Sequence, residues 1–151
     1  MKTTLLTLVL AVAALVPAYA QDFDPKPGTV LWETLYDPPY TEPTDIPAGD
    51  SLRKELFDLL RTRLEPKAKQ PILFSGSLKA YKNWALFVGE SQDKEGKPIA
   101  YPELGNSDTV GLWLRTADGW KLVSYEGGLS DVFYDIWPEM YGMPRELLLA
   151  R

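Results

Sequence analysis

Apolar residues recur at helical spacing between residues 50 and 64, which makes this segment the clearest predicted helix. The stripe consists of Leu52, Leu56, Leu59, Leu60 and Leu64. Residues spaced by three and four fall on one side of an α-helix, so the leucines predict one buried face. Asp50 is a favourable N-cap residue, and Pro66 is expected to end the helix. The charged residues off the stripe are interpreted as a solvated face: Arg53, Lys54, Asp58 and Arg61.

Four later segments have the β-branched and aromatic composition of strands. They cover residues 72–80, 84–90, 108–116 and 120–127. A turn at residues 81–83 and the Asp118-Gly119 turn divide them into two predicted hairpins. Residues 29–36 lie within a proline-rich segment and predict one further short strand at a sheet edge.

Short helices are predicted at the C-terminus. Ser130 can cap a helix over residues 131–137, which Pro138 and Gly142 should end. Pro144 suits the first turn of a last helix over residues 145–150. The apolar side chains expected to face the sheet are Val132, Phe133, Ile136 and Trp137.

The order of these elements predicts an α+β fold. We expect an antiparallel sheet of four to five strands packed on one long helix, with short C-terminal helices. A long helix across such a sheet buries its leucine stripe and one sheet face together. Residues 50–151 would form this single α+β domain, and residues 21–49 a proline-rich arm with a short strand.

This element order resembles the cystatin-like and NTF2-like group of folds, in which a curved sheet wraps around a helix. The inhibitory motif of cystatins, Gln-x-Val-x-Gly, does not occur in the chain. The chain also looks like small uncharacterised exported bacterial proteins, in the runs at residues 84–88, 112–116 and 130–132. Neither resemblance implies an activity.

The first twenty residues have the pattern of a cleavable signal peptide. Lys2 precedes an uncharged apolar run at residues 5–16, and Ala18-Tyr19-Ala20 offers a cleavage site. The run has 12 residues, whereas a membrane-spanning helix needs about 20. We therefore expect export to a periplasm or the outside of the cell, with Gln21 as the first residue and no membrane anchor in the mature form.

Composition excludes several kinds of chemistry. Without Lys2, the mature chain carries 15 basic and 21 acidic residues, a net charge of −6, which disfavours nucleic acid as a partner. The chain has no histidine and no cysteine, which excludes the Ser-His-Asp triad, the Cys-His pair and the usual zinc sites. We predict no metal and no cofactor.

The second hairpin suggests a ligand-binding face. If Asp118 and Gly119 are its two turn residues, alternation puts one group of side chains together: Trp113, Arg115, Leu122, Ser124 and Glu126. The opposite face, expected to be core, holds Val110, Leu112, Leu114, Val123 and Tyr125. An aromatic ring beside a cation, a hydroxyl and a carboxylate is typical of a polar-ligand pocket. The alternative is a half-exposed sheet face, or one that the proline arm covers.

Acidic residues near the end of that hairpin are the remaining candidates. Asp108, Glu126, Asp131 and Asp135 could supply an acid and a base, or oxygen ligands for Ca²⁺. Asp131 is also explained by a helix N-terminus alone. The predicted ligand-binding residues are Trp113, Arg115, Ser124, Glu126 and Asp131, and no catalytic residue is assigned.

Two classes of function follow from these observations. The first is a non-enzymatic binding module for an envelope protein, a peptide or a glycan. The second is a carboxylate-dependent enzyme acting on a cell-wall or sugar substrate. A structural envelope component is a third alternative.

Overall fold

The computed structural model describes residues 37–103, 105–129 and 131–149. Five strands form one antiparallel sheet in the order β1-β2-β3-β4-β5, and one long helix, α1, follows β1 in the chain. The elements are β1 (Tyr40–Asp45), α1 (Ser51–Ala68), β2 (Leu73–Lys82), β3 (Trp84–Gln92), β4 (Asp108–Thr116) and β5 (Gly119–Gly127). A 3-10 turn η2 (Phe133–Ile136) and short helices α2 (Trp137–Tyr141) and α3 (Glu146–Leu149) complete the fold. The predicted α+β class is confirmed.

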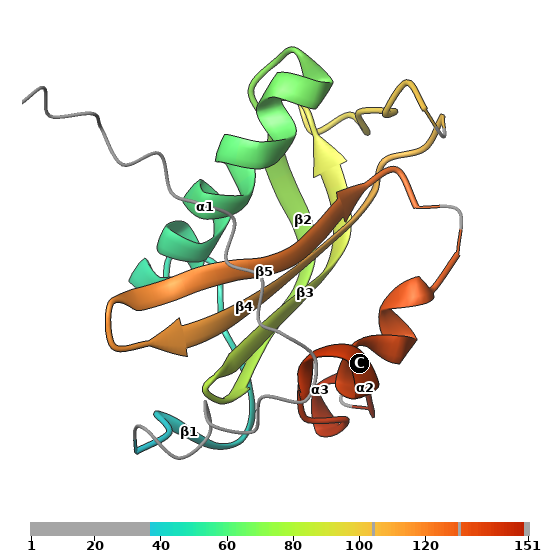
Figure 1. The fold of residues 1–151 in the computed structure, drawn as a ribbon. Coiled ribbons are helices and arrows are strands. Elements are labelled where there is room, and N and C mark those ends of the chain that lie inside the picture. Colours follow the sequence, from blue (N-terminus) through green and yellow to red (C-terminus); the bar gives the residue numbers. More distant parts are fainter. Residues whose placement is uncertain (1–36, 104, 130, 150–151) are drawn as a thin grey trace, which may run out of the picture.

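The sheet is covered on both faces (Figure 1). On one face, the leucines of α1 pack with Leu78, Phe87 and Trp113. On the other, Leu86, Leu112 and Leu114 pack with side chains of the C-terminal helices. The central strands β3 and β4 are therefore buried on both sides over much of their length. The predicted signal peptide at residues 1–20 and the predicted strand at residues 29–36 lie outside the described residues.

Helix α1 begins as predicted and ends later than predicted. The Asp50 carboxylate accepts a hydrogen bond of 2.8 Å from the Leu52 N–H, which caps the first turn. Pro66 lies inside the helix, which continues to Ala68. Proline removes one intrahelical donor, but Pro66 and Thr62 are exposed, so water can hydrate the carbonyl left free.

The proline arm contains a strand that the sequence did not predict. Strand β1 pairs with β2 through Tyr40, Thr44 and Asp45, and the register shifts between Tyr40 and Thr44. Pro43 lies within that irregularity on an edge strand, where its missing N–H removes no hydrogen bond from the regular ladder.

The second hairpin has a different register from the predicted one, in which Asp118 and Gly119 were the two turn residues. Thr116 pairs with Gly119, so Ala117 and Asp118 are the two central turn residues. A register shift then occurs between Leu112 and Trp113, because their partners on β5 are Ser124 and Leu122. One extra residue on a strand reverses which face each later side chain occupies. Ser124 therefore lies opposite Leu112, and Tyr125 packs on the α1 side of the sheet.

The C-terminal segment also differs from the prediction. Pro138 does not end a helix but lies in the first turn of α2, whereas Gly142 ends α2 in the left-handed conformation at φ 76°, as expected. Trp137 is buried as predicted, but Val132, Phe133 and Ile136 are exposed. The 3-10 turn has about three residues per turn, which changes the face on which these side chains lie. Among the described helices, none is long and apolar enough to cross a membrane.

Candidate functional site

The predicted ligand-binding residues do not share one surface. Trp113 is fully buried between the sheet and α1, so its ring is part of the core. Ser124 pairs with Leu112 instead of Trp113. Glu126 lies on the edge strand β5, and its carboxylate is 3.6 Å from the Lys67 Nζ of α1. That ion pair is partly exposed and contributes little to stability.

Arg115 lies at the other end of the same hairpin. It pairs with Trp120 across the turn-proximal part of β4 and β5. Its guanidinium lies near Tyr40, whose pKa is raised, mainly by burial and also by the Asp50 charge, while Arg115 acts in the opposite direction. Arg115 thus lies at the turn end of the hairpin, whereas Ser124 lies in the middle of β5 and Glu126 near its far end.

Asp131 comes together with Asp108, in a pocket of about 420 Å³ on the side of the sheet away from α1. Its other walls are Val88, Gly89, Leu129, Val132 and Tyr134. The two carboxylates are exposed, and Asp131 Oδ1 accepts a hydrogen bond of 2.7 Å from the Val132 N–H. Within residues 37–149, leaving out 104 and 130, no three acidic, histidine or cysteine side chains form a metal-binding group.

A larger and more basic site lies between α1 and β2. It is an open groove of about 920 Å³. Its walls come from the start of α1, the first half of β2 and the end of β3, and include three cations: Arg53, Lys54 and Arg61. Asp50 is the acidic residue among the lining side chains, and its carboxylate is engaged as the cap of α1. The groove therefore has an excess of positive charge in a protein whose net charge is −5.

Two aromatic rings form the floor of this groove. The ring centroids of Phe57 and Phe74 are 5.0 Å apart. The Arg53 guanidinium lies 4.7 Å from the Phe57 centroid, and the Arg61 guanidinium lies 5.6 Å from the Phe74 centroid. Stacking of this kind holds a guanidinium in place and is favourable in a partly dry site. The two arginines are thus fixed over an apolar floor.

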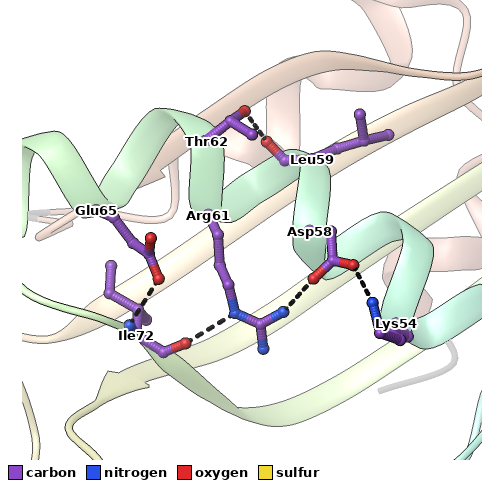
Figure 2. Close-up of polar contacts among 7 residues, drawn as sticks. All are labelled: Lys54, Asp58, Leu59, Arg61, Thr62, Glu65 and Ile72. Carbon is purple, nitrogen blue, oxygen red and sulfur yellow. Dashed lines mark hydrogen bonds and ion pairs between the residues drawn. The ribbon is translucent and has the colours of Figure 1, made fainter.

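Hydrogen bonds to backbone carbonyls fix the arginines further. Arg53 donates to the Ile46 carbonyl at 2.8 Å and to the Gly76 carbonyl at 3.0 Å. Arg61 donates through Nε to the Ile72 carbonyl at 2.9 Å and through Nη1 to the Asp58 carboxylate at 2.7 Å (Figure 2). Arg53 thus connects α1 to β2, and Arg61 connects α1 to Ile72, the residue just before β2.

The cations differ in how far they are neutralised. Asp58 accepts hydrogen bonds from both Lys54, at 2.5 Å, and Arg61 (Figure 2). The Lys54 contact, with Arg61 in support, lowers the pKa of the Asp58 carboxyl below its ordinary value. Arg53 contacts no carboxylate among the residues that the structure describes, and burial lowers the pKa of its guanidinium. Arg53 is therefore the least compensated cation of the groove.

The sequence contained a signal for this site. Arg53, Phe57 and Arg61 are spaced by four residues, so they form one row along the helix beside the leucine stripe. From the sequence alone, Arg53 and Arg61 are expected on a solvated face, and Phe57 lies outside the leucine stripe. Phe57 is buried. Because Arg53 and Arg61 lie on the same row of the helix, the burial of Phe57 places both arginines beside β2.

Comparison of the chain with protein-family models, with curated proteins and with solved structures gives no match.

Proposed function

We propose that the mature chain is an exported, non-enzymatic binding module that holds a carboxylate-bearing ligand in the α1–β2 groove. The observation that carries this proposal is the Arg53 guanidinium, held over Phe57 at the groove wall by two backbone carbonyls and without a carboxylate partner in the described chain. A guanidinium has five N–H donors, so donors remain for a ligand anion. Its fixed position reduces the entropy lost on binding.

Export is part of the same proposal. The pattern of residues 1–20 supports cleavage after Ala20 and release to a periplasm or the outside of the cell. The α1–β2 groove would then be available to ligands of that compartment, such as an envelope protein, a peptide or a glycan.

The cystatin-like element order belongs to this proposal as well. It is supported by a helix that follows the first strand and is itself followed by four consecutive antiparallel strands. The resemblance to small exported bacterial proteins stands beside it as a further proposal. A carboxylate-dependent enzyme has less support, because Asp108 and Asp131 are both exposed in their pocket.

The test measures binding of two carboxylate probes to the mature protein by calorimetry. The probes are a peptide with alternating glutamates and an oligomer of galacturonic acid. Arg53→Gln should weaken the binding of whichever probe binds by about tenfold or more, because a charge-assisted hydrogen bond contributes about 1.5–3 kcal/mol. Arg145→Gln is the matched control, because Arg145 is an exposed arginine on the C-terminal segment that pairs with Glu139.

Asp58→Asn provides a second test in the opposite direction. It removes the carboxylate that neutralises Lys54 and Arg61, so it should tighten binding and steepen its salt dependence. The proposal fails if neither probe binds, or if Arg53→Gln and Arg145→Gln bind equally well.

A further inference from the structure

The outer edge of β2 is covered by β1 over only half of its length. Strand β1 pairs with Lys79, Ala80 and Lys82, and the Ile46 N–H donates to the Leu78 carbonyl at 2.9 Å. The chain then turns away at Pro47 into α1. Along residues 73–77, β2 therefore has no strand beside it on this side among the described residues. This free edge forms one wall of the α1–β2 groove.

Alternate residues of β2 direct their backbone groups toward this edge. The Leu78 carbonyl accepts from the Ile46 N–H, so the backbone groups of Leu78 and of every second residue before it point toward this edge. These residues are Gly76, Phe74 and, just before β2 begins, Ile72. Two observations agree with this. The Gly76 carbonyl accepts from Arg53. Ser91, the β3 partner of Phe74, uses its own N–H and carbonyl with Ser107 and Ile99, away from β2.

Side chains of α1 already occupy the ends of this row. The Ile72 N–H donates to the Glu65 carboxylate at 3.1 Å, and the Ile72 carbonyl accepts from Arg61 (Figure 2). The Gly76 carbonyl is taken by Arg53. In the middle of the row, the Phe74 N–H, the Phe74 carbonyl and the Gly76 N–H have no hydrogen-bond partner in the part of the chain that the structure describes.

These open groups match the backbone of one more strand. An added strand bonds to every second residue of an edge, so Phe74 would exchange two hydrogen bonds with it and the Gly76 N–H would give a third. Ile72 and Leu78 are already bonded on this side, so the gap takes about five residues, or about 17 Å of extended chain.

The charge of the groove selects the side chains of such a strand. Every second side chain of an added strand would face α1, where Arg53, Lys54 and Arg61 line the groove. Acidic residues at these alternate positions would complement Arg53, which has no carboxylate partner within the described chain, and the charge of Lys54 and Arg61 that the single Asp58 carboxylate leaves uncompensated. We propose that the groove takes an extended acidic segment of another protein, which adds to β2 opposite Phe74. This inference rests on the proposed function and specifies its ligand as a polypeptide bound by strand addition.

The experiment uses one peptide and two methylated forms of it. The probe is acetyl-Thr-Glu-Val-Glu-Val-Glu-Thr-amide, in which the glutamates share one face and their N–H groups share one edge. One form carries N-methyl groups on the glutamates, and the other carries them on the valines and the last threonine. All three peptides have the same charge.

Strand addition predicts that the two methylated forms behave differently. The form methylated on the edge that meets β2 should bind about thirtyfold more weakly or worse. It loses the N–H that would donate to the Phe74 carbonyl, and its methyl groups would lie against the strand edge. The other form should stay within about threefold of the parent. Binding of the parent peptide should also slow solvent exchange at the Phe74 and Gly76 amides, measured by NMR.

Each other outcome has a defined meaning. If both methylated forms bind like the parent, or the two amides do not respond, strand addition is wrong while the anion-binding groove stands. If only the galacturonic acid oligomer binds, the ligand is a glycan and the polypeptide inference is wrong. If no probe binds, both proposals fail, and the α1 side chains only protect the strand edge.

Discussion

Replacement of Trp113 tests whether α1 really covers the face of the sheet on which this residue lies. Trp113 is fully buried, pairs with Ala85 and Leu122 on the neighbouring strands, and belongs to the core beneath α1. Its six-membered ring also lies against Gly111, where an added Cβ would come within 2.5 Å of a ring carbon. Gly111 has no side chain that could fill the space left by truncation of the ring.

The expected cost of Trp113→Ala is therefore large. Truncating a buried tryptophan costs about 3–5 kcal/mol, a large share of the roughly 5–15 kcal/mol that holds a domain folded. With a urea m-value of about 2 kcal/mol/M, the unfolding midpoint should fall by about 2 M. Trp113→Phe should cost much less, because it keeps an aromatic ring and removes an indole N–H that has no hydrogen-bond partner among the residues that the structure describes.

Urea unfolding followed by far-UV circular dichroism measures these costs without depending on tryptophan fluorescence. Trp120→Ala is the matched control, because Trp120 packs against the same core but is only half-buried, and its loss should shift the midpoint less. If Trp113→Ala unfolds at the same urea concentration as the wild type, the ring is not in the core. The face that carries Trp113 would then again be a candidate ligand-binding surface.

Two further predictions concern a buried hydroxyl cluster and the N-terminus. Tyr101 Oη lies 2.7 Å from Ser91 Oγ, which is 2.8 Å from Thr109 Oγ1, so Tyr101→Phe should cost about 1 kcal/mol in urea unfolding at pH 7. Burial raises the pKa of the Tyr101 hydroxyl in the folded state. The stability that the neutral hydroxyl contributes is therefore present below about pH 10 and is lost as pH rises through the folded-state pKa. Tyr101→Phe should consequently lose less stability in alkali than the wild type. Intact-mass analysis of protein recovered outside the cytoplasm should give a chain that begins at Gln21. A recovered mass that still includes residues 1–20 would contradict cleavage.

The elements that the sequence predicted well depend on local interactions. The Asp50 carboxylate caps α1 by accepting a hydrogen bond from the N–H of Leu52, two residues later in the chain. A contact between such close neighbours can be predicted from the sequence. The leucine stripe predicted the buried face of α1 because Leu56, Leu60 and Leu64 follow one helical period. The hairpins were found because a short turn and two apolar runs are also local.

The register of the second hairpin could not be predicted in the same way. The turn residues and the shift between Leu112 and Trp113 are set by how β4 and β5 fit against α1 and the C-terminal helices. The prediction also assumed that only one sheet face is core. Here both faces are covered, so Trp113 and Leu114, on opposite faces, are equally buried.

The candidate groove was missed for a related reason. Whether a strand edge is free depends on where its neighbour ends, and β1 itself was not predicted because Pro43 argues against a regular strand. Arg53 and Arg61 resemble ordinary solvent-facing helix residues until β2 is placed beside them. Their functional interest comes from the Gly76 and Ile72 carbonyls, which belong to a segment far away in the sequence.

The pattern of bonds along β2 bears on whether α1 protects the edge or prepares it for a ligand. Protection requires that the groups an incoming strand would use are already bonded. Glu65 and Arg61 achieve this at Ile72, but Arg53 can only donate, so it bonds the Gly76 carbonyl and cannot satisfy the N–H beside it. Phe74 lies between them, and neither its N–H nor its carbonyl has a hydrogen-bond partner among the described residues. Its own ring forms part of the groove floor at this point. The edge of β2 is thus bonded at both ends and open at its centre among the described residues, as expected of a docking site for a short strand. Arg53, the cation beside it, has no carboxylate partner within the described chain.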